Sequence, residues 1–185
     1  LSLDMGLLSI LKKMKASEEE LRILMLGLDN AGKTTILKKM TEEDISKVAP
    51  TQGFNVKSMM KEGVKLNVWD IGGQKTIREY WSNYFNSADA LVYVIDSSDT
   101  ARLQESGQQL KELLEHEELA KIPLLIFANK QDILQAVGVE DITEEFQLSS
   151  IADRIWTIQA SSATEGTGLE DGMQWLVTTY QDSKA

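Results

Sequence analysis

The segment Gly27–Thr34, with the sequence Gly-Leu-Asp-Asn-Ala-Gly-Lys-Thr, constrains the fold more than any other part of the chain. It follows an apolar run, Leu21–Leu26, and precedes the residues Ile36, Leu37 and Met40, which have helical spacing. A glycine-rich turn between a strand and a helix lets backbone N–H groups point at phosphate oxygens, and the helix N-terminus adds the positive end of its dipole. The pattern therefore predicts a phosphate-binding P-loop, and the alternative is a strand–helix turn without a ligand.

The residue types in this loop indicate how it would hold a nucleotide. Lys33 is expected to bridge the β- and γ-phosphates, and the hydroxyl of Thr34 is expected to ligate Mg²⁺. The nucleotide should contact the loop and the start of the helix at Asp29, Asn30, Ala31, Gly32, Lys33, Thr34 and Thr35.

Strand and helix patterns alternate along the rest of the chain. Two strand runs around a turn at 61–63 predict a hairpin, and short apolar runs farther along are typical of parallel strands buried on both faces. The sequence therefore predicts an α/β fold with a six-stranded, mostly parallel sheet, one antiparallel edge strand and helices on both faces. The expected strands are 21–26, 56–60, 64–69, 90–95, 124–128 and 155–159, and the later helices are 102–118 and 169–180.

Length and charge exclude several classes of protein. The 185 residues suit one domain. The chain has no cysteine, which favours a reducing, cytoplasmic setting. The longest apolar run is far shorter than the roughly 18 residues that a spanning helix needs. A net charge of −10 argues against nucleic acid as a partner, but a local nest of N–H groups can still bind one nucleotide.

The beginning of the chain has its own pattern. We expect the natural start at Met5, with Leu1–Asp4 a remnant before it, and a main domain over residues 21–182. Within residues 5–20, the segment 7–15 predicts an amphipathic helix with a basic face, capable of weak membrane contact at most. The N-myristoylation motif needs Ser or Thr where Ile10 stands, so we expect no myristoyl group.

Three residues beyond the loop are candidates for magnesium binding and hydrolysis. Asp70 leaves the second hairpin strand into Gly72-Gly73, so it could hold the Mg²⁺ shell through a water while the Gly73 N–H meets the γ-phosphate. Gln74 could orient the attacking water, and Thr51 could supply oxygens to Mg²⁺ and the γ-phosphate. The expected catalytic residues are thus Gln74, Lys33 and Thr51, and the expected metal ligands are Thr34 and Thr51.

The segment Asn129-Lys130-Gln131-Asp132 indicates which base is bound. The Asp132 carboxylate can accept hydrogen bonds from guanine N1–H and N2–H₂, which adenine cannot offer. Lys130 can lie over the ring, and the backbone at Ser162-Ala163 can donate to the guanine O6. The expected ligands are therefore GTP or GDP with Mg²⁺.

These motifs, in this order, resemble those of the Ras-like small GTPases. Four segments are similar to those of the ADP-ribosylation factor (Arf) and Arf-like branch. They are Gly-Leu-Asp-Asn-Ala-Gly-Lys-Thr-Thr, Pro-Thr-Gln-Gly-Phe-Asn, Trp-Asp-Ile-Gly-Gly-Gln and Ala-Asn-Lys-Gln-Asp. The segments 5–15 and 170–175 are most similar to Arf-like members.

The resemblance implies a GDP/GTP switch in which the hairpin slides in register and expels the N-terminal helix. It implies effector contacts through Phe54, Trp69 and Tyr84, for which ordinary core packing is the alternative. It also implies a monomer with an activating protein, an exchange factor and β-sandwich carriers of lipidated proteins as partners. Cytoplasmic, Golgi, ciliary and microtubule-associated pools follow from the same resemblance. The alternatives within the family are a coat-recruiting Arf and a regulator of tubulin cofactors.

Two positions predict slow hydrolysis without a partner. Asp29 would place a negative charge beside the γ-phosphate, and Ala49 stands where heterotrimeric G-protein α subunits carry a built-in arginine. With no arginine expected nearby, an activating protein should supply the missing rate. Two other classes remain as rivals, a module that binds GTP without hydrolysing it and an ATP-dependent kinase; Gln74 argues against the first and Asp132 against the second.

Overall fold

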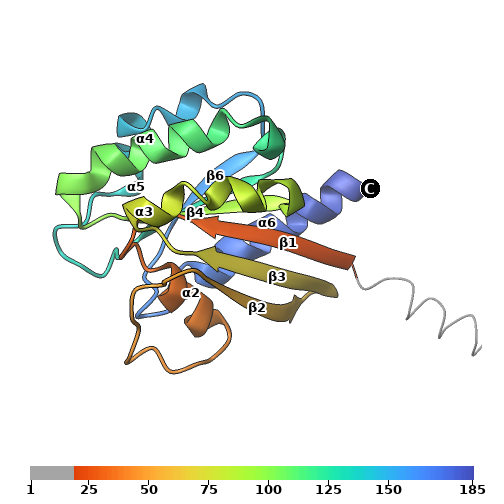
Figure 1. Cartoon of the computed structure of the whole chain (residues 1–185), viewed down its shortest axis with the longest axis horizontal. Coiled ribbons are helices and arrows are strands. Elements are labelled where there is room, and N and C mark those ends of the chain that lie inside the picture. The colour runs from red at the N-terminus through yellow and green to blue at the C-terminus, as the bar shows by residue number, and fades with distance from the viewer. Residues whose placement is uncertain (1–18) are drawn as a thin grey trace, which may run out of the picture.

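The computed structural model describes residues 19–185, and a six-stranded sheet forms its centre (Figure 1). The strands are β1 (Glu19–Leu26), β2 (Phe54–Lys61), β3 (Val64–Ile71), β4 (Ala90–Asp96), β5 (Leu124–Asn129) and β6 (Trp156–Ala160). Their order is β2-β3-β1-β4-β5-β6; β2 is antiparallel to β3, and every other neighbouring pair is parallel. The six-stranded α/β prediction is confirmed, whereas the helix expected at 7–15 lies outside the described residues.

Helices cover both faces of the sheet. One buried cluster joins α2 and α6 to one face, and a second joins α4, α5 and the 3₁₀ segment η1 to the other. The helices are α2 (Lys33–Met40), α3 (Lys75–Arg78), α4 (Leu103–Leu114), α5 (Val139–Glu145) and α6 (Leu169–Lys184), with 3₁₀ segments η1 (Trp81–Ser87), η2 (Thr100–Arg102), η3 (Glu117–Leu119) and η4 (Leu148–Ser150).

The middle strands are apolar because they are covered on both sides. Every residue of β5 is buried, and so is every residue of β4 except Asp96 at its end. A strand of this kind cannot show the alternation of a half-exposed strand, which explains the continuous apolar runs in the sequence.

The helix expected over 102–118 is shorter in the structure, because α4 ends at Leu114 and η3 follows. The buried guanidinium of Arg154 donates to the Leu114 carbonyl at 3.1 Å and to the Leu119 carbonyl at 2.8 Å. These bonds satisfy carbonyls that the helix end leaves free. The short helix α5 was not anticipated, because its seven residues carry too little periodic signal.

The hairpin β2–β3 is longer than the sequence indicated, with eight residues in each strand. Buried and partly exposed residues alternate along β3 from Val64 to Asp70, because Val64, Leu66 and Val68 face the buried cluster shared with α2 and α6, whereas the other face of the strand is only partly covered. At the far end of the hairpin, Lys61 pairs with Glu170 and Glu62 accepts a hydrogen bond from Gln174, so side chains of α6 hold the hairpin tip.

The loops that carry the sequence motifs leave the carboxyl ends of the parallel strands. The P-loop follows β1, Asp70 is near the end of β3, and Asn129 ends β5. This edge is where open α/β sheets bind ligands. Among residues 19–185, no helix is long and apolar enough to cross a membrane.

Candidate functional site

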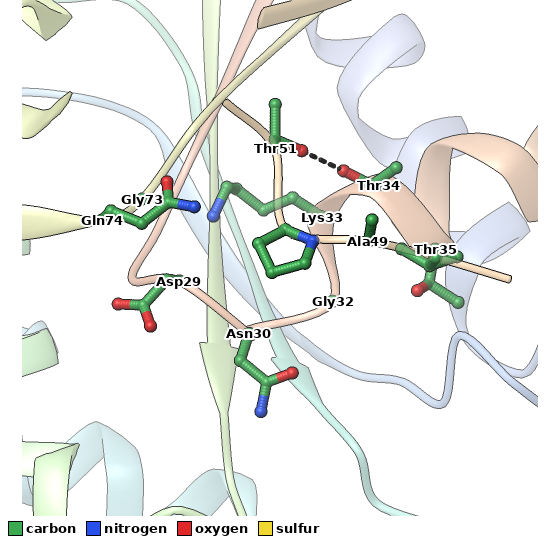
Figure 2. A pocket seen from close by; sticks show the side chains of 12 residues that line it. Asp29, Asn30, Gly32, Lys33, Thr34, Thr35, Ala49, Thr51, Gly73 and Gln74 are labelled. Atoms are coloured by element: carbon green, nitrogen blue, oxygen red, sulfur yellow. Dashed lines mark hydrogen bonds between the residues drawn. The ribbon is translucent and has the colours of Figure 1, made fainter. Parts of the chain in front are cut away.

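A pocket of about 360 Å³ opens between the P-loop, the segment before β2 and the turn after β3 (Figure 2). Its residues come from parts of the chain that are up to 45 positions apart, and nine of the twelve were predicted to contact nucleotide or metal or to take part in hydrolysis. The lining residues are Asp29, Asn30, Gly32, Lys33, Thr34, Thr35, Val48, Ala49, Pro50, Thr51, Gly73 and Gln74.

Lys33 lies along the floor of this pocket. Its Nζ donates to the backbone carbonyls of Gly27 and Leu28, each at 2.9 Å, and only 5% of the residue is exposed. Burial lowers the pKa of the Lys33 amine to about 8, although the negative charges of Asp70 and Asp29 oppose this shift. A bound phosphate would favour the charged amine and raise the pKa again.

This shift predicts that nucleotide affinity falls above pH 8. Free Lys33 is mostly charged at pH 7 and mostly neutral at pH 9, whereas the phosphate-bound form stays charged. Binding must then take up a proton, so affinity should fall about tenfold from pH 7 to pH 9. Displacement of a fluorescent guanine nucleotide across this range would measure the effect. In the control Lys33→Arg the side chain does not titrate, so an equal decline there would contradict the assignment.

The three residues expected around magnesium lie together. Thr34 Oγ1 is 2.7 Å from Thr51 Oγ1, the contact drawn in Figure 2, and it donates to Asp70 Oδ2 at 2.5 Å. Asp70 is fully buried, and within residues 19–185 its second oxygen, Oδ1, has no hydrogen-bond partner. A buried carboxylate oxygen without a partner is costly, so this cluster is suited to a cation or to its water shell.

Gly73 and Gln74 close the opposite side of the pocket. Gly73 packs so tightly on the P-loop that an added Cβ would lie 2.3 Å from the Gly27 oxygen and 2.4 Å from the Asp29 nitrogen. Only glycine can bring this N–H so close to the phosphate position. Gln74 lines the pocket, and its buried Oε1 has no hydrogen-bond partner in the part of the chain that the structure describes, so this oxygen can accept from a water.

Asn129 ties the predicted base-binding segments to the P-loop. Its Nδ2 donates to the Ala31 carbonyl at 2.9 Å, while its Oδ1 accepts from the Ala163 N–H at 3.1 Å and from the Ser161 hydroxyl at 3.2 Å. The structure thus assigns Asn129 a positioning contact that the sequence pattern alone did not specify.

Lys130 and Asp132 follow the carboxyl end of β5 and do not line the phosphate pocket, so their contact with a base stays a prediction. The Asp132 carboxylate is exposed and accepts from the Ser162 hydroxyl at 2.8 Å, which fixes its orientation. The Lys130 amine pairs with Asp96 Oδ2 at 2.7 Å. Burial would raise the pKa of Asp96, but hydrogen bonds from Lys130 and Ser98 outweigh it and lower the pKa. Asp96 therefore anchors the end of Lys130, a contact that the sequence analysis missed.

Two arginines near Asp29 correct one expectation. Arg102 contacts the Asp29 carboxylate at 2.8 Å, and Arg78 lies 3.5 Å from the same oxygen. Burial would raise the pKa of Asp29, but the hydrogen bond and charge of Arg102 outweigh it and lower the pKa. The expectation that no arginine lies near this loop is therefore wrong. Arg102 is 73 positions from Asp29 along the chain, so sequence spacing gave no signal.

Phe54, Trp69 and Tyr84 form a triangular cluster on the hairpin side of the molecule. Their ring centroids are 5.5 to 6.0 Å apart. Phe54 is 52% exposed, whereas Trp69 and Tyr84 also pack against the core. The cluster is thus partly core and partly surface. A neighbouring pocket of about 620 Å³, lined in part by Tyr84, Tyr80 and Gln74, extends this surface toward the phosphate site.

Comparison with known proteins identifies relatives over almost the whole chain. The model of the ADP-ribosylation factor family matches residues 7–180. ADP-ribosylation factor-like protein 3 of Chlamydomonas reinhardtii is 57% identical over 94% of this chain and 98% of its own length. The protein of the same name from Caenorhabditis elegans is 53% identical, over 96% of this chain and 97% of its own. ADP-ribosylation factor-like protein 2 of Dictyostelium discoideum is 54% identical over 94% of each chain.

A solved structure has the same fold. The Arl6 (BBS3) small GTPase of Trypanosoma brucei, determined with the bound nucleotide analogue GppNp, superposes with a TM-score of 0.80. It is 34% identical in sequence, and the match covers 88% of this chain and 98% of that one.

Proposed function

Since this chain belongs to the ADP-ribosylation factor family, we propose that its GTP-bound form binds carriers of lipidated proteins and releases their cargo. As a small GTPase of this family it binds guanine nucleotide and hydrolyses GTP to GDP and phosphate. The proposal concerns which partner proteins bind specifically to the GTP-bound form. It favours the Arf-like three role over a coat-recruiting Arf and over a regulator of tubulin cofactors.

The class of partner rests on the identity to relatives named ADP-ribosylation factor-like protein 3, and the dependence of binding on nucleotide rests on the contact between Thr51 and Thr34. Thr51 lies near the end of the irregular segment 41–53, and Phe54 begins β2 only three residues later. A γ-phosphate and its cation that hold Thr51 would therefore fix the start of the hairpin. The nucleotide state then determines the position of Phe54 on the partner-binding surface.

Magnesium fits the cluster formed by Thr34, Thr51 and Asp70. Mg²⁺ prefers a few protein oxygens together with phosphate oxygens and water, and these residues offer two hydroxyls and a buried carboxylate. Thr34 and Thr51 would hold the ion directly and Asp70 through a water. When bound, the ion neutralises charge on the β- and γ-phosphates.

The other site residues would bind the phosphates, the attacking water and the base. Lys33 compensates phosphate charge, and the P-loop N–H groups from Asp29 to Thr35 bind the oxygens. The Gly73 N–H binds the γ-phosphate, and Gln74 Oε1 accepts a hydrogen bond from the water that attacks it. At the other end, Asp132 selects guanine and Lys130 covers the ring. In this structure the Ala163 N–H donates to Asn129 Oδ1 and the Ser162 N–H donates to the Thr167 carbonyl, so one of these bonds must open before the backbone can donate to the guanine O6.

An activating protein and an exchange factor are the regulators expected for a small GTPase of this family. We propose that intrinsic hydrolysis is slow, since position 49 carries alanine and the two arginines near the P-loop, Arg78 and Arg102, are held in ion pairs with acidic residues. We further propose a monomer in the cytoplasm with Golgi, ciliary and microtubule-associated pools, and at most weak membrane contact through residues 7–15. The high identity to proteins named ADP-ribosylation factor-like 3 supports this set of roles.

The partner proposal predicts binding that depends on nucleotide and on Phe54. A purified β-sandwich carrier should bind the protein loaded with a non-hydrolysable GTP analogue at least about tenfold more tightly than the GDP form. Phe54→Ala should remove most of that difference, because a half-exposed aromatic at a contact surface is a typical binding hot spot. Calorimetry would give the affinities, and release of a fluorescent lipidated peptide would report cargo displacement.

The matched control is Met60→Ala on the same strand. Met60 is 61% exposed and lies at the far end of β2 from the pocket, so its loss should leave carrier binding unchanged. Equal carrier binding in both nucleotide states would contradict the proposal. GTP-dependent binding of a coat protein or a tubulin cofactor, with no binding of the carrier, would favour the corresponding alternative.

A further inference from the structure

Asp29 is the centre of a charged network at the rim of the phosphate pocket. Arg102 holds this residue at two points, through its carboxylate and through its backbone carbonyl, each at 2.8 Å. Arg78 approaches the same carboxylate oxygen to 3.5 Å. Arg102 is in turn held by Asp99, at 2.8 Å. The Asp29 carboxylate, labelled in Figure 2, is thus paired with two guanidinium groups.

Arg78 also reaches the residue that faces the γ-phosphate. Its Nε donates to the Gly73 carbonyl at 2.7 Å, and its other end pairs with Glu105 of α4 at 2.7 Å. The Arg78 side chain is only 9% exposed, so these contacts are largely shielded from water. One side chain therefore joins α4, the P-loop and the turn at Gly73.

The placement matters because Asp29 lines the pocket in which phosphate would bind. An uncompensated carboxylate there would repel the phosphates, most strongly the terminal one, since like charges at short range in a partly buried site repel. Two guanidinium groups supply the compensating charge. One of the two, Arg78, also fixes the backbone of Gly73.

We propose that Arg78 and Arg102 are positioning residues for GTP, which neutralise Asp29 and hold it away from the γ-phosphate. Arg78 has the second task of fixing Gly73, whose N–H meets that phosphate. The inference rests on the proposed nucleotide contacts of Gly73 and the P-loop. It differs from a purely structural role because the arginines should affect the triphosphate more than the diphosphate.

A double-mutant cycle tests the charge-neutralising role. The affinities for GDP and for a non-hydrolysable GTP analogue would be measured by displacement of a fluorescent nucleotide. Arg102→Ala should lower analogue affinity about tenfold relative to GDP affinity, because Asp29 then keeps only the more distant Arg78 as a partner and its charge is less well neutralised. In the Asp29→Asn background the same substitution should change that ratio less than about twofold, because no charge remains to be neutralised.

Arg78→Ala separates the second task. The Arg78→Ala variant should also lower the ratio of analogue affinity to GDP affinity. Adding Asp29→Asn should restore only part of this loss, because Arg78→Ala removes the hydrogen bond to the Gly73 carbonyl whether residue 29 is Asp or Asn. Complete restoration would overturn the role assigned to the Arg78–Gly73 contact. Arg22→Ala, at an exposed arginine of β1, is the matched control and should leave both affinities unchanged.

The remaining outcomes are equally decisive. Arg102→Ala would overturn the inference if it weakened both nucleotides equally, or if its effect persisted in the Asp29→Asn background. Thermal melting of each variant without nucleotide would show whether a loss of fold explains either result. Failure of the unmodified protein to bind either nucleotide would instead defeat the proposed nucleotide contacts themselves, so the two failures can be distinguished.

Discussion

Replacing Asp132 by Asn should weaken GTP and GDP binding by about 10²–10⁴-fold and create a preference for xanthine nucleotides. The carboxylate is expected to accept two hydrogen bonds from guanine, each worth about 1.5–3 kcal/mol because the acceptor is charged. An amide keeps one acceptor but presents an N–H₂ group to the guanine N2–H₂, so two donors face each other. Xanthine carries an oxygen at that position, and the amide can donate to it.

The measurement is a competition of GTP and XTP against a fluorescent guanine nucleotide. The hydrogen bond from Ser162 holds one Asp132 oxygen, so the position of the side chain should be retained in the variant. Asp141→Asn, at an exposed aspartate in the first turn of α5, is the control for the loss of one negative charge. Retention of GTP affinity in the Asp132 variant would show that this carboxylate does not recognise the guanine base.

Replacing Gln74 by Leu should reduce the rate of GTP hydrolysis by about 10²–10⁴-fold, the contribution typical of a group that assists proton transfer. The Gln74 Oε1 is buried, unpartnered and part of the pocket wall, so it can hold the attacking water without breaking another bond. Leucine has a similar volume but no acceptor. Nucleotide affinity should therefore change less than about threefold.

Single-turnover hydrolysis, with and without an activating protein, measures this effect. The unmodified protein alone should hydrolyse GTP more slowly than about 10⁻² s⁻¹, the range of a GTPase that carries its arginine in the same chain. Gln52→Leu, at an exposed residue of the neighbouring pocket, is the control. An unchanged rate in Gln74→Leu would remove this residue from the mechanism, and a rate above the stated limit would remove the need for a partner arginine.

The sequence predicted the parts of the site that depend on short motifs at strand ends. Gly27–Thr34 and Asp70 each follow a recognisable apolar run, and parallel strands bring their carboxyl ends to one edge of the sheet. That rule was enough to place Thr34 and Asp70 together, and the 2.5 Å contact between them agrees with it.

What the sequence did not predict depends on pairs of distant side chains. Nothing in the local pattern around Arg102 indicates that it reaches Asp29, because the pairing arises only when the fold brings η2 beside the P-loop. The same is true of Asn129, whose amide joins loops that are separated by about a hundred residues. The end of α4 was misplaced for a similar reason, since a remote arginine, Arg154, satisfies its last carbonyls.

The alternation along β3 limits how the hairpin can move. A shift of β3 against β1 by one residue would turn Val64, Leu66 and Val68 toward the exposed face, whereas a shift by two residues keeps every side chain on its own face. The allowed registers are therefore discrete, with no stable position between them. Asp70 now lies opposite Met25, and one such step would carry it about 7 Å along β1, away from Thr34. Any slide that keeps the core intact must therefore dismantle the cation cluster in a single, all-or-none step.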